Sequence, residues 1–237
     1  MIVQRFYVAN VHDKWGPLNL NHKIWINDKE LVDKWLVTLH YKINDELILF
    51  NDETERLYRI IQIEQPGSVQ LELITEQSRK LSNSHIYLLL PLLKKENNLL
   101  IIRMAVELGV HNMIPILNER SAGILFDYEK TKEIVIKACE QSDRSDIPEI
   151  REEPIDLRTA IEEYSKLPLI VFGQWKESDT IDNNSLQFGI LLSPEEGWSD
   201  SELELIQSSN LLKFNIDDIL ITTQIDALAK LINLISR

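Results

Sequence analysis

The chain has 237 residues, and 44% of them are apolar, which is enough for one or two domains with packed cores. Its formal net charge of −13 argues against a general nucleic-acid binder, because such proteins gain much of their affinity from basic groups that displace counterions from phosphates. Residues 1–150 carry 18 Lys and Arg against 22 Asp and Glu, whereas residues 151–237 carry 7 against 16. This distribution leaves room for an RNA-binding surface only in the first two thirds of the chain.

The sequence contains no sign of export, of a membrane span or of a metal site. Cys139 is the single cysteine, so an internal disulfide is excluded, and the chain does not open on a basic segment followed by an apolar core. The most apolar run, residues 86–93, is far shorter than the roughly 20 residues of a membrane helix. The histidines are scattered and form no metal-ligand spacing with Cys139. We therefore expect a cytoplasmic protein without a metal.

Residues 1–80 are typical of a small β-rich domain with one helix. Asp28 can cap a helix that runs to Leu39, with apolar residues at helical spacing along one face. Turn residues, at Asn51-Asp52 and Pro66-Gly67, punctuate the strands that follow. The expected strands are residues 46–50, 57–64 and 69–75. Together they indicate a meander that closes toward a small barrel.

Three tryptophans of this first domain, Trp15, Trp25 and Trp35, allow two interpretations. They could stack on the bases of a nucleic acid. Alternatively, they fill the domain core. This second interpretation is favoured, because aromatic residues dominate small cores.

The polar segment 77–84 is the expected linker, and residues 85–237 alternate between strand and helix patterns. The expected strands are 86–90, 113–117, 169–172, 188–192 and 211–215, and the expected helices are 99–108, 128–141, 156–165, one beginning at Asp200, and 224–235. Such alternation predicts an α/β fold with a mostly parallel sheet covered by helices on both faces.

The segment 194–198 lies between a predicted strand and a predicted helix. Ser199 followed by Glu202 forms a capping box at the start of that helix. Ligands of parallel sheets usually bind at loops beyond the carboxyl ends of the strands, so this segment is a candidate ligand loop. The common phosphate, dinucleotide, serine-hydrolase and zinc-protease signatures are absent from the sequence.

Three groups of residues resemble the RsmE family, the 16S ribosomal RNA (uracil-N3)-methyltransferases of the SPOUT superfamily. The first group lies near the start of the chain, where Asn44 stands at a position that is usually glycine. The first group is residues 5–8 (RFYV), 42–47 (KINDEL) and 49–50 (LF). The second and strongest is residues 107–110 (ELGV), 114–115 (IP), 119–121 (ERS), 140–142 (EQS), Arg144 and 147–148 (IP). The third consists of the two segments, at 193–197 and 216–225, that would hold a cofactor.

The resemblance implies both a fold and an activity. Residues 1–80 would form a PUA-like β-barrel that binds RNA, and residues 85–237 a SPOUT methyltransferase domain with a C-terminal trefoil knot around S-adenosylmethionine. The enzyme would act as a homodimer on N3 of a uridine in 16S rRNA of the small ribosomal subunit. Such a reaction depends largely on positioning of the methyl group and removal of the N3 proton.

The resemblance also carries over candidate site residues, while it leaves the catalytic residues unidentified. The cofactor would contact Leu192, Ser193, Glu195, Gly197, Ile219 and Leu220. Contact with RNA, or a role in shaping the cleft, is implied for Arg5, Arg120, Gln141 and Arg144. For Arg120 and Arg144, ion pairs with Glu119, Glu140 or Asp143 are an equal alternative.

Two cofactor segments depart from the family pattern. The GPEGG-type loop reads SPEEG at residues 193–197, and the segment similar to LGxRILRTETA has Ile216, Asp218 and Ile221 in place of glycine and two arginines. A side chain in place of a left-handed glycine costs about 1 kcal/mol, and Glu196 is the residue of most concern. These departures define an alternative function, a degenerate SPOUT-fold relative that binds RNA or an assembly partner without methyl transfer.

Overall fold

The computed structural model describes residues 3–8, 22–51, 54–64, 67–76, 85–92, 95–121, 123–173, 179, 187–194 and 196–215. It divides the chain into two compact units, residues 1–81 with 143–147, and residues 82–142 with 148–237. The division after residue 81 falls in the polar segment 77–84. The assignment of residues 143–147 to the first unit was not expected from the sequence.

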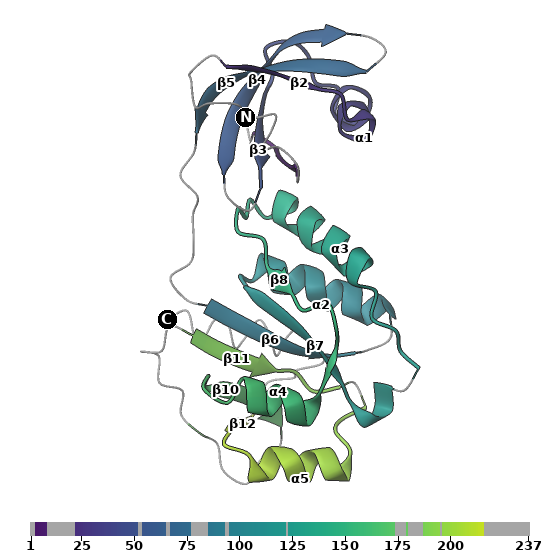
Figure 1. Cartoon of the computed structure of the whole chain (residues 1–237), viewed down its shortest axis with the longest axis vertical. Helices are drawn as coiled ribbons and strands as arrows, with labels where there is room; N and C mark the ends of the chain where they lie inside the picture. Colours follow the sequence, from purple (N-terminus) through teal and green to yellow (C-terminus); the bar gives the residue numbers. More distant parts are fainter. Residues whose placement is uncertain are drawn as a thin grey trace. The chain divides into compact units, whose positions relative to one another are not determined.

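The first unit is built on one five-stranded sheet with the order β1-β3-β4-β5-β2 (Figure 1). β1 pairs with β3 in parallel, and the other pairs are antiparallel. The strands are β1 (Arg5–Tyr7), β2 (Lys23–Ile26), β3 (Glu46–Phe50), β4 (Glu55–Glu64) and β5 (Ser68–Glu76). The three strands predicted from the sequence are confirmed as β3, β4 and β5.

The helix of this unit begins where the sequence predicts. Asp28 caps α1 (Lys29–Asp33) by accepting a hydrogen bond of 3.0 Å from the N–H of Leu31. The helix then widens into a π-helical turn, η1 (Lys34–Thr38), in which the N–H of Leu39 reaches back to Lys34 O at 3.0 Å. The sequence periodicity gave the length of the helix but not this change of winding.

Of the three tryptophans, Trp35 is fully buried and packs edge-on against Phe6, with ring centroids 5.5 Å apart. Trp25 is half-buried in β2, and Trp15 lies outside the described residues. The core interpretation is thus confirmed for Trp35.

The second unit contains a seven-stranded sheet with the order β12-β10-β11-β6-β7-β8, and β9 also pairs with β7. All of its recorded strand pairs are parallel. The strands are β6 (His85–Pro91), β7 (Asn112–Leu117), β8 (Glu149–Ile150), β9 (Ile155–Asp156), β10 (Leu169–Gly173), β11 (Gln187–Leu191) and β12 (Leu212–Asn215). The helices are α2 (Lys95–Glu107), η2 (Glu119–Ser121), α3 (Tyr128–Gln141), α4 (Leu157–Glu163) and α5 (Asp200–Ser208).

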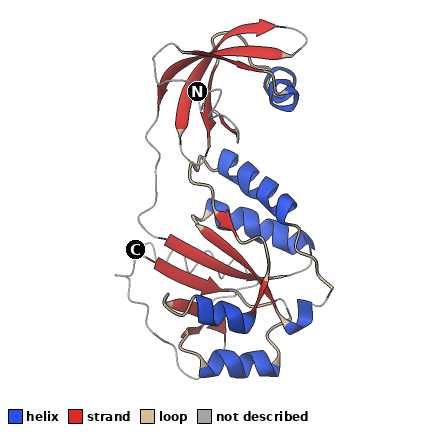
Figure 2. Ribbon diagram, in the orientation of Figure 1, coloured by secondary structure: helices blue, strands red, loops and turns tan. Residues whose placement is uncertain are grey.

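Both faces of this sheet are buried. One row across β10, β11, β6 and β7 consists of Ile170, Ile190, Leu88 and Met113, and the next row consists of Val171, Leu191, Leu89 and Ile114. Successive residues of a strand point to opposite faces, and every residue of both rows is buried. Figure 2 shows α2 and α3 on one side of the sheet and α4 and α5 on the other. The predicted α/β fold is therefore confirmed.

The elements predicted for the second unit can be compared with those that the structure describes. Helices α2 to α5 and the longer strands lie within a few residues of their predicted positions. The short helix η2 was not predicted, and the two-residue strands β8 and β9 are too short to leave an alternation pattern. The expected helix 224–235 and the residues that would complete a knot lie outside the described residues. No helix among the described residues is long and apolar enough to cross a membrane.

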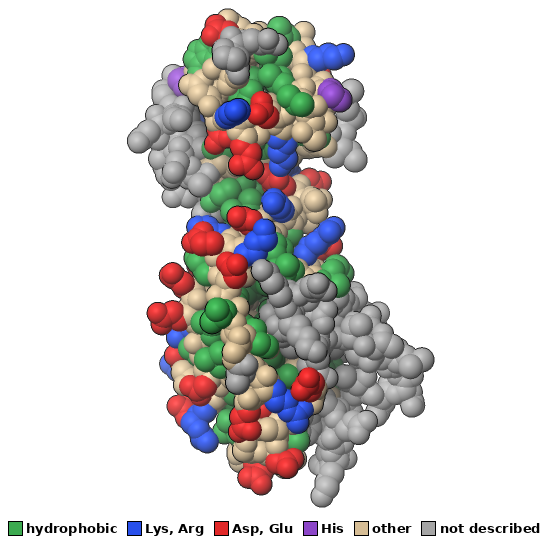
Figure 3. All heavy atoms as spheres, turned by 90° about the vertical axis from the view of Figure 1, so that its right-hand side faces the viewer, with side chains coloured by type: hydrophobic (Ala, Val, Ile, Leu, Met, Phe, Trp, Pro, Cys, Tyr) green, Lys and Arg blue, Asp and Glu red, His purple; other side chains and the backbone are tan. Residues whose placement is uncertain are grey.

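On the face shown in Figure 3, carboxylates and Lys or Arg side chains alternate over the described surface. The described atoms of this face do not form a broad basic area. This agrees with the net charge of the chain and makes any attraction for RNA on this face short-ranged.

The backbone conformation of Asn44 explains why the family that the sequence resembles usually has a glycine at this position. Its backbone is left-handed, with φ of +76°, and its N–H donates to Ile60 O of β4 at 2.8 Å. Asparagine tolerates this conformation better than other residues that carry a Cβ.

We expect Asn44→Ala to destabilise β3 and β4 locally by about 1 kcal/mol and Asn44→Gly to leave them nearly unchanged. Native-state hydrogen exchange of the two strands measures this difference. Asn27→Ala is the matched control, because Asn27 is exposed and its φ is not positive. Equal exchange in Asn44→Ala and in the control would contradict the role assigned to the left-handed backbone.

Candidate functional site

The candidate ligand loop begins where three adjacent parallel strands end. Leu192, directly after β11, is buried, and its N–H donates to Leu89 O of β6 at 3.1 Å. The hydroxyl of Ser193 donates to Phe172 O of β10 at 3.3 Å. The start of the loop is therefore fixed to both neighbouring strands, at the edge of the sheet where ligands of this fold class bind.

Gly197 occupies the left-handed position of the loop. Its φ is +73°, its N–H closes a turn onto Pro194 O at 3.0 Å, and a Cβ built on it would meet no other group within 4 Å. A side chain here would be strained by the backbone conformation, although space for it exists.

Glu196 is exposed, and its φ is not positive. The expectation that Glu196 strains the loop is therefore wrong. The glycine that the loop retains is at the left-handed position, and the glutamate is at a position without left-handed strain.

Arg120 connects the loop to the end of β7. It lies in the short helix η2, which Ser121 closes: the N–H of Asn118 donates to Ser121 Oγ at 2.9 Å, and that hydroxyl donates to Asn118 O at 2.7 Å. Arg120 Nη1 donates to the carbonyl oxygens of Glu196 and Gly197, the latter at 3.2 Å. These partners are backbone carbonyls of the loop and not the carboxylates weighed as the alternative for Arg120, so the contacts are compatible with a role in shaping the cleft.

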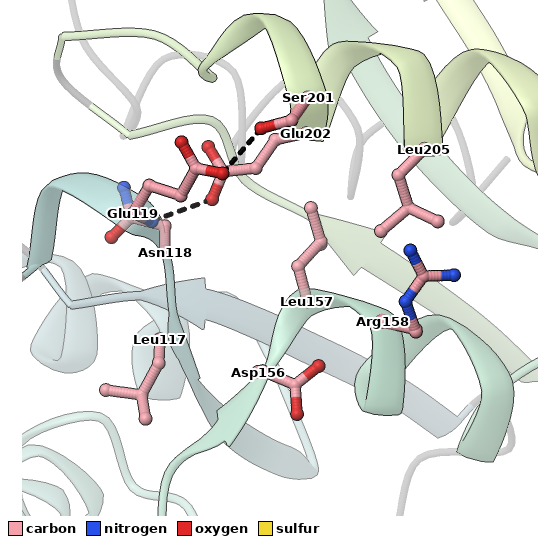
Figure 4. A pocket seen from close by; sticks show the side chains of 9 residues that line it. All are labelled: Leu117, Asn118, Glu119, Asp156, Leu157, Arg158, Ser201, Glu202 and Leu205. Carbon is pink, nitrogen blue, oxygen red and sulfur yellow. Dashed lines mark hydrogen bonds between the residues drawn. The ribbon is translucent and has the colours of Figure 1, made fainter.

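The carboxylate of Glu202 joins the same two segments a second time. The predicted capping box is confirmed, because Glu202 Oε2 accepts from the N–H of Ser199 at 2.9 Å and the N–H of Glu202 donates to Ser199 Oγ at 3.2 Å. Its other oxygen, Oε1, accepts from the N–H of Glu119 at 2.9 Å (Figure 4). Glu202 is only 6% exposed, and both oxygens of its carboxylate are satisfied by backbone donors.

A third connection runs between side chains. Ser201 Oγ donates to Glu119 Oε1 at 2.5 Å, as Figure 4 shows. The hydroxyls of Ser201 and Ser199 hold the pKa of the Glu119 carboxyl below its usual value, so it is ionised at neutral pH. Sequence patterns revealed the capping box, but they gave no sign that its carboxylate also binds a residue 83 positions away.

A pocket of about 350 Å³ opens between the end of β7 and the first turns of α4 and α5 (Figure 4). Its lining combines leucines with acidic, amide, hydroxyl and guanidinium groups, namely Leu117, Asn118, Glu119, Asp156, Leu157, Arg158, Ser201, Glu202 and Leu205. Asp156 caps α4, accepting from the N–H of Thr159 at 2.9 Å and from its hydroxyl at 2.6 Å, and these bonds lower the pKa of Asp156. Of the residues predicted to bind the cofactor, the three that the structure describes, Leu192, Ser193 and Gly197, do not line this pocket.

Arg5, a predicted RNA contact, is engaged within the first unit. Its guanidinium binds Glu55 Oε1 at 2.8 Å, Asp143 Oδ1 at 3.3 Å and Ser145 Oγ at 3.1 Å. Ser145 in turn donates to the other oxygen of Glu55, whose side chain is 2% exposed. These contacts attach residues 143–147 to the first unit.

Of the other predicted RNA contacts, Arg144 pairs with Asp146 at 2.7 Å, which is not one of the partners expected from the sequence, and its side chain is 9% exposed. Gln141 is exposed at the end of α3. The cofactor residues Glu195, Ile219 and Leu220 lie outside the described residues. Leu192, Ser193 and Gly197 are thus the predicted cofactor residues that the structure brings together.

Comparison with known proteins gives consistent matches. A family model described as an RNA methyltransferase domain matches residues 80–223. The ribosomal RNA small subunit methyltransferase E of Rickettsia conorii is 29% identical over 195 residues, which are 79% of each chain. The protein of the same name from Aquifex aeolicus is 33% identical over 112 residues, which are 45% of this chain and 48% of that one.

Solved structures show the same fold over nearly the whole length. A Legionella pneumophila protein described as a methyltransferase, with the bound cofactor SAM, superposes with a TM-score of 0.81 at 22% identity and covers 100% of this chain and 98% of that one. The ribosomal RNA small subunit methyltransferase E of Neisseria gonorrhoeae, bound to S-adenosyl methionine, gives 0.80 at 21% identity and 98% of each chain. The family model, the relatives and the residue groups noted above agree, and the chain belongs to the RsmE family of RNA methyltransferases.

Proposed function

We propose that this protein transfers a methyl group from S-adenosylmethionine to N3 of a uridine in the 16S rRNA of the small ribosomal subunit. The observation that carries the proposal is a set of contacts made by Glu119 and Arg120. Arg120 binds carbonyl oxygens of the loop 193–199, which joins β11 to α5, and Glu119 binds the first turn of α5 that follows this loop. Residues 119–121 are part of the family pattern, and they support the loop in which this chain departs from that pattern. The relatives whose names specify small-subunit rRNA supply the substrate.

The described part of the loop fits the cofactor. Leu192 and Ser193 are anchored to neighbouring strands, and the space beside Gly197 is open. We propose that these residues bind the cofactor with Glu195, Ile219 and Leu220. S-adenosylmethionine supplies an electrophilic methyl group carried on a positively charged sulfur.

The chain contributes mainly binding and orientation to such a reaction. Holding the uridine N3 in line with the methyl group converts a bimolecular encounter into a step within one complex. The N3 proton must also leave, and the residue that takes it is not identified. Rigid attachment of the loop to the ends of β6 and β10 serves this positioning role, because small displacements of reacting groups are costly.

The wider architecture belongs to the same proposal. It includes a PUA-like barrel formed by residues 1–80, a methyltransferase domain over residues 85–237 with a C-terminal trefoil knot, a homodimer and a cytoplasmic location. For RNA contact we propose the exposed Gln141, while Arg5 and Arg144 shape the segment 143–147 through their carboxylate partners. The interspersed charges in Figure 3 favour such local contacts over long-range attraction.

The alternative, a degenerate relative without methyl transfer, would be supported by a loop that side chains obstruct. Glu196 is exposed and its φ is not positive, so its backbone is free of the left-handed strain that a degenerate loop would carry there, which supports the enzyme. Ile221, the second residue of concern, lies outside the described residues.

We expect S-adenosylhomocysteine to bind the full chain in an isothermal titration. Gly197→Val should weaken this binding by about tenfold or more, because a β-branched residue is strained at a positive φ. Gly123→Val is the matched control, since Gly123 has a φ of +83° and equally open space but lies in another loop. Absence of binding at millimolar ligand would contradict the proposed enzyme.

We expect Glu196→Gly to change the dissociation constant of S-adenosylhomocysteine by no more than about twofold, since exposed substitutions away from special backbone positions have small effects. The same variant should methylate small subunits that lack the modification at close to the unaltered rate. A gain of tenfold or more would show that Glu196 obstructs the loop and would favour the degenerate relative.

A further inference from the structure

We propose that Arg120 is a positioning residue that fixes the orientation of the peptide groups of residues 196–198 in the candidate ligand loop, and thereby the side of the loop that offers N–H donors to a ligand. The inference rests on the proposed function for the identity of that ligand. The part of the inference that concerns the loop conformation depends only on the contacts of Arg120.

One guanidinium nitrogen binds two successive carbonyl oxygens, those of Glu196 and Gly197. Two carbonyls of adjacent residues turn toward one point only in a restricted backbone conformation, and the left-handed φ of Gly197 lies between them. A cation at this point therefore selects this conformation over others that the loop could adopt.

The orientation of the carbonyls determines where the donors point. In a trans peptide the N–H points opposite to the C=O. The N–H of Trp198 shares a peptide with Gly197 O, so it faces away from Arg120, and no described residue accepts a hydrogen bond from it. Arg120 thus holds the carbonyl oxygen of the Gly197–Trp198 peptide on one side of the loop. The N–H of Trp198 points to the opposite side, where a ligand could accept from it.

The base of Arg120 is itself held rigidly. Ser121 closes the turn onto the buried Asn118, Glu202 binds the N–H of Glu119, and Ser201 binds its carboxylate. Because residues 118–121 are fixed by several hydrogen bonds, the guanidinium of Arg120 can hold the loop carbonyls in a defined position.

Contacts to backbone carbonyls do not depend on the side chains of the loop. Ser193 and Glu196 replace glycines of the related pattern, yet neither side chain takes part in the contacts of Arg120. This is how the loop keeps its conformation in spite of its altered sequence.

The test compares three variants of the full chain. Arg120→Met removes the donors but keeps an unbranched side chain, Arg120→Lys restores a positive charge with a different donor geometry, and Arg151→Met is the control. Arg151 is a surface residue of the same unit, paired with Glu163 at 2.7 Å and remote in sequence from the loop.

In the unliganded protein, Arg120→Met should raise hydrogen exchange in residues 192–199 by about tenfold, while α2 and α3 remain protected. It should weaken S-adenosylhomocysteine binding by about tenfold or more, Arg120→Lys should recover part of that loss, and Arg151→Met should match the unaltered protein in both measurements.

Unchanged exchange in residues 192–199 of Arg120→Met would overturn the proposal. A lower kcat on RNA with unchanged exchange and unchanged S-adenosylhomocysteine affinity would overturn it as well, and would make Arg120 an RNA contact. If the unaltered protein binds no S-adenosylhomocysteine, the proposed function fails, and the exchange measurement still decides whether Arg120 holds the loop.

Discussion

The carboxylate of Glu202 is the constraint on which the candidate site depends. One oxygen completes the N-terminal cap of α5, and the other binds the N–H of Glu119 at the end of β7. A buried carboxylate is costly unless its oxygens are hydrogen-bonded, and here each receives a backbone donor. The start of α5 and the end of β7 are therefore held at a fixed separation, and Arg120, directly after β7, binds the loop that leads into α5.

The parallel sheet brings the segments of the candidate site to the same edge. The ends of β10, β11, β6 and β7 lie at one edge because the strands are parallel neighbours, with buried rows of apolar side chains on both faces. Burial of these rows fixes the strand register, since a shift by one residue would exchange the two faces. Because the core fixes the ends of the strands, it also fixes where the following loops begin. Polar contacts, such as the hydrogen bond from Ser193 to Phe172 O, further hold the loops in place.

The sequence predicted the elements well and the connections between them poorly. Hydrophobic periodicity located α3, β3 and the five longer strands of the parallel sheet, because burial of one or both faces leaves a regular pattern. The capping box was visible since it is a contact over three residues. The partners of Arg5, Arg120 and Arg144 were missed, because an arginine has the same appearance in a sequence whether it meets a carboxylate, a carbonyl or a phosphate.

The contacts of residues 143–147 have a consequence for how this chain can be divided. Ser145 is buried among Arg5 and Glu55 of the first unit, although the residues on either side of the segment, Ser142 and Pro148, belong to the second. The polypeptide thus passes between the units three times, and a single cleavage in the segment 77–84 would leave them covalently connected. A fragment that begins at residue 85 would carry Ser145 and Asp143 without their partners, so the two units are not interchangeable modules in the sense that applies to domains joined by one linker.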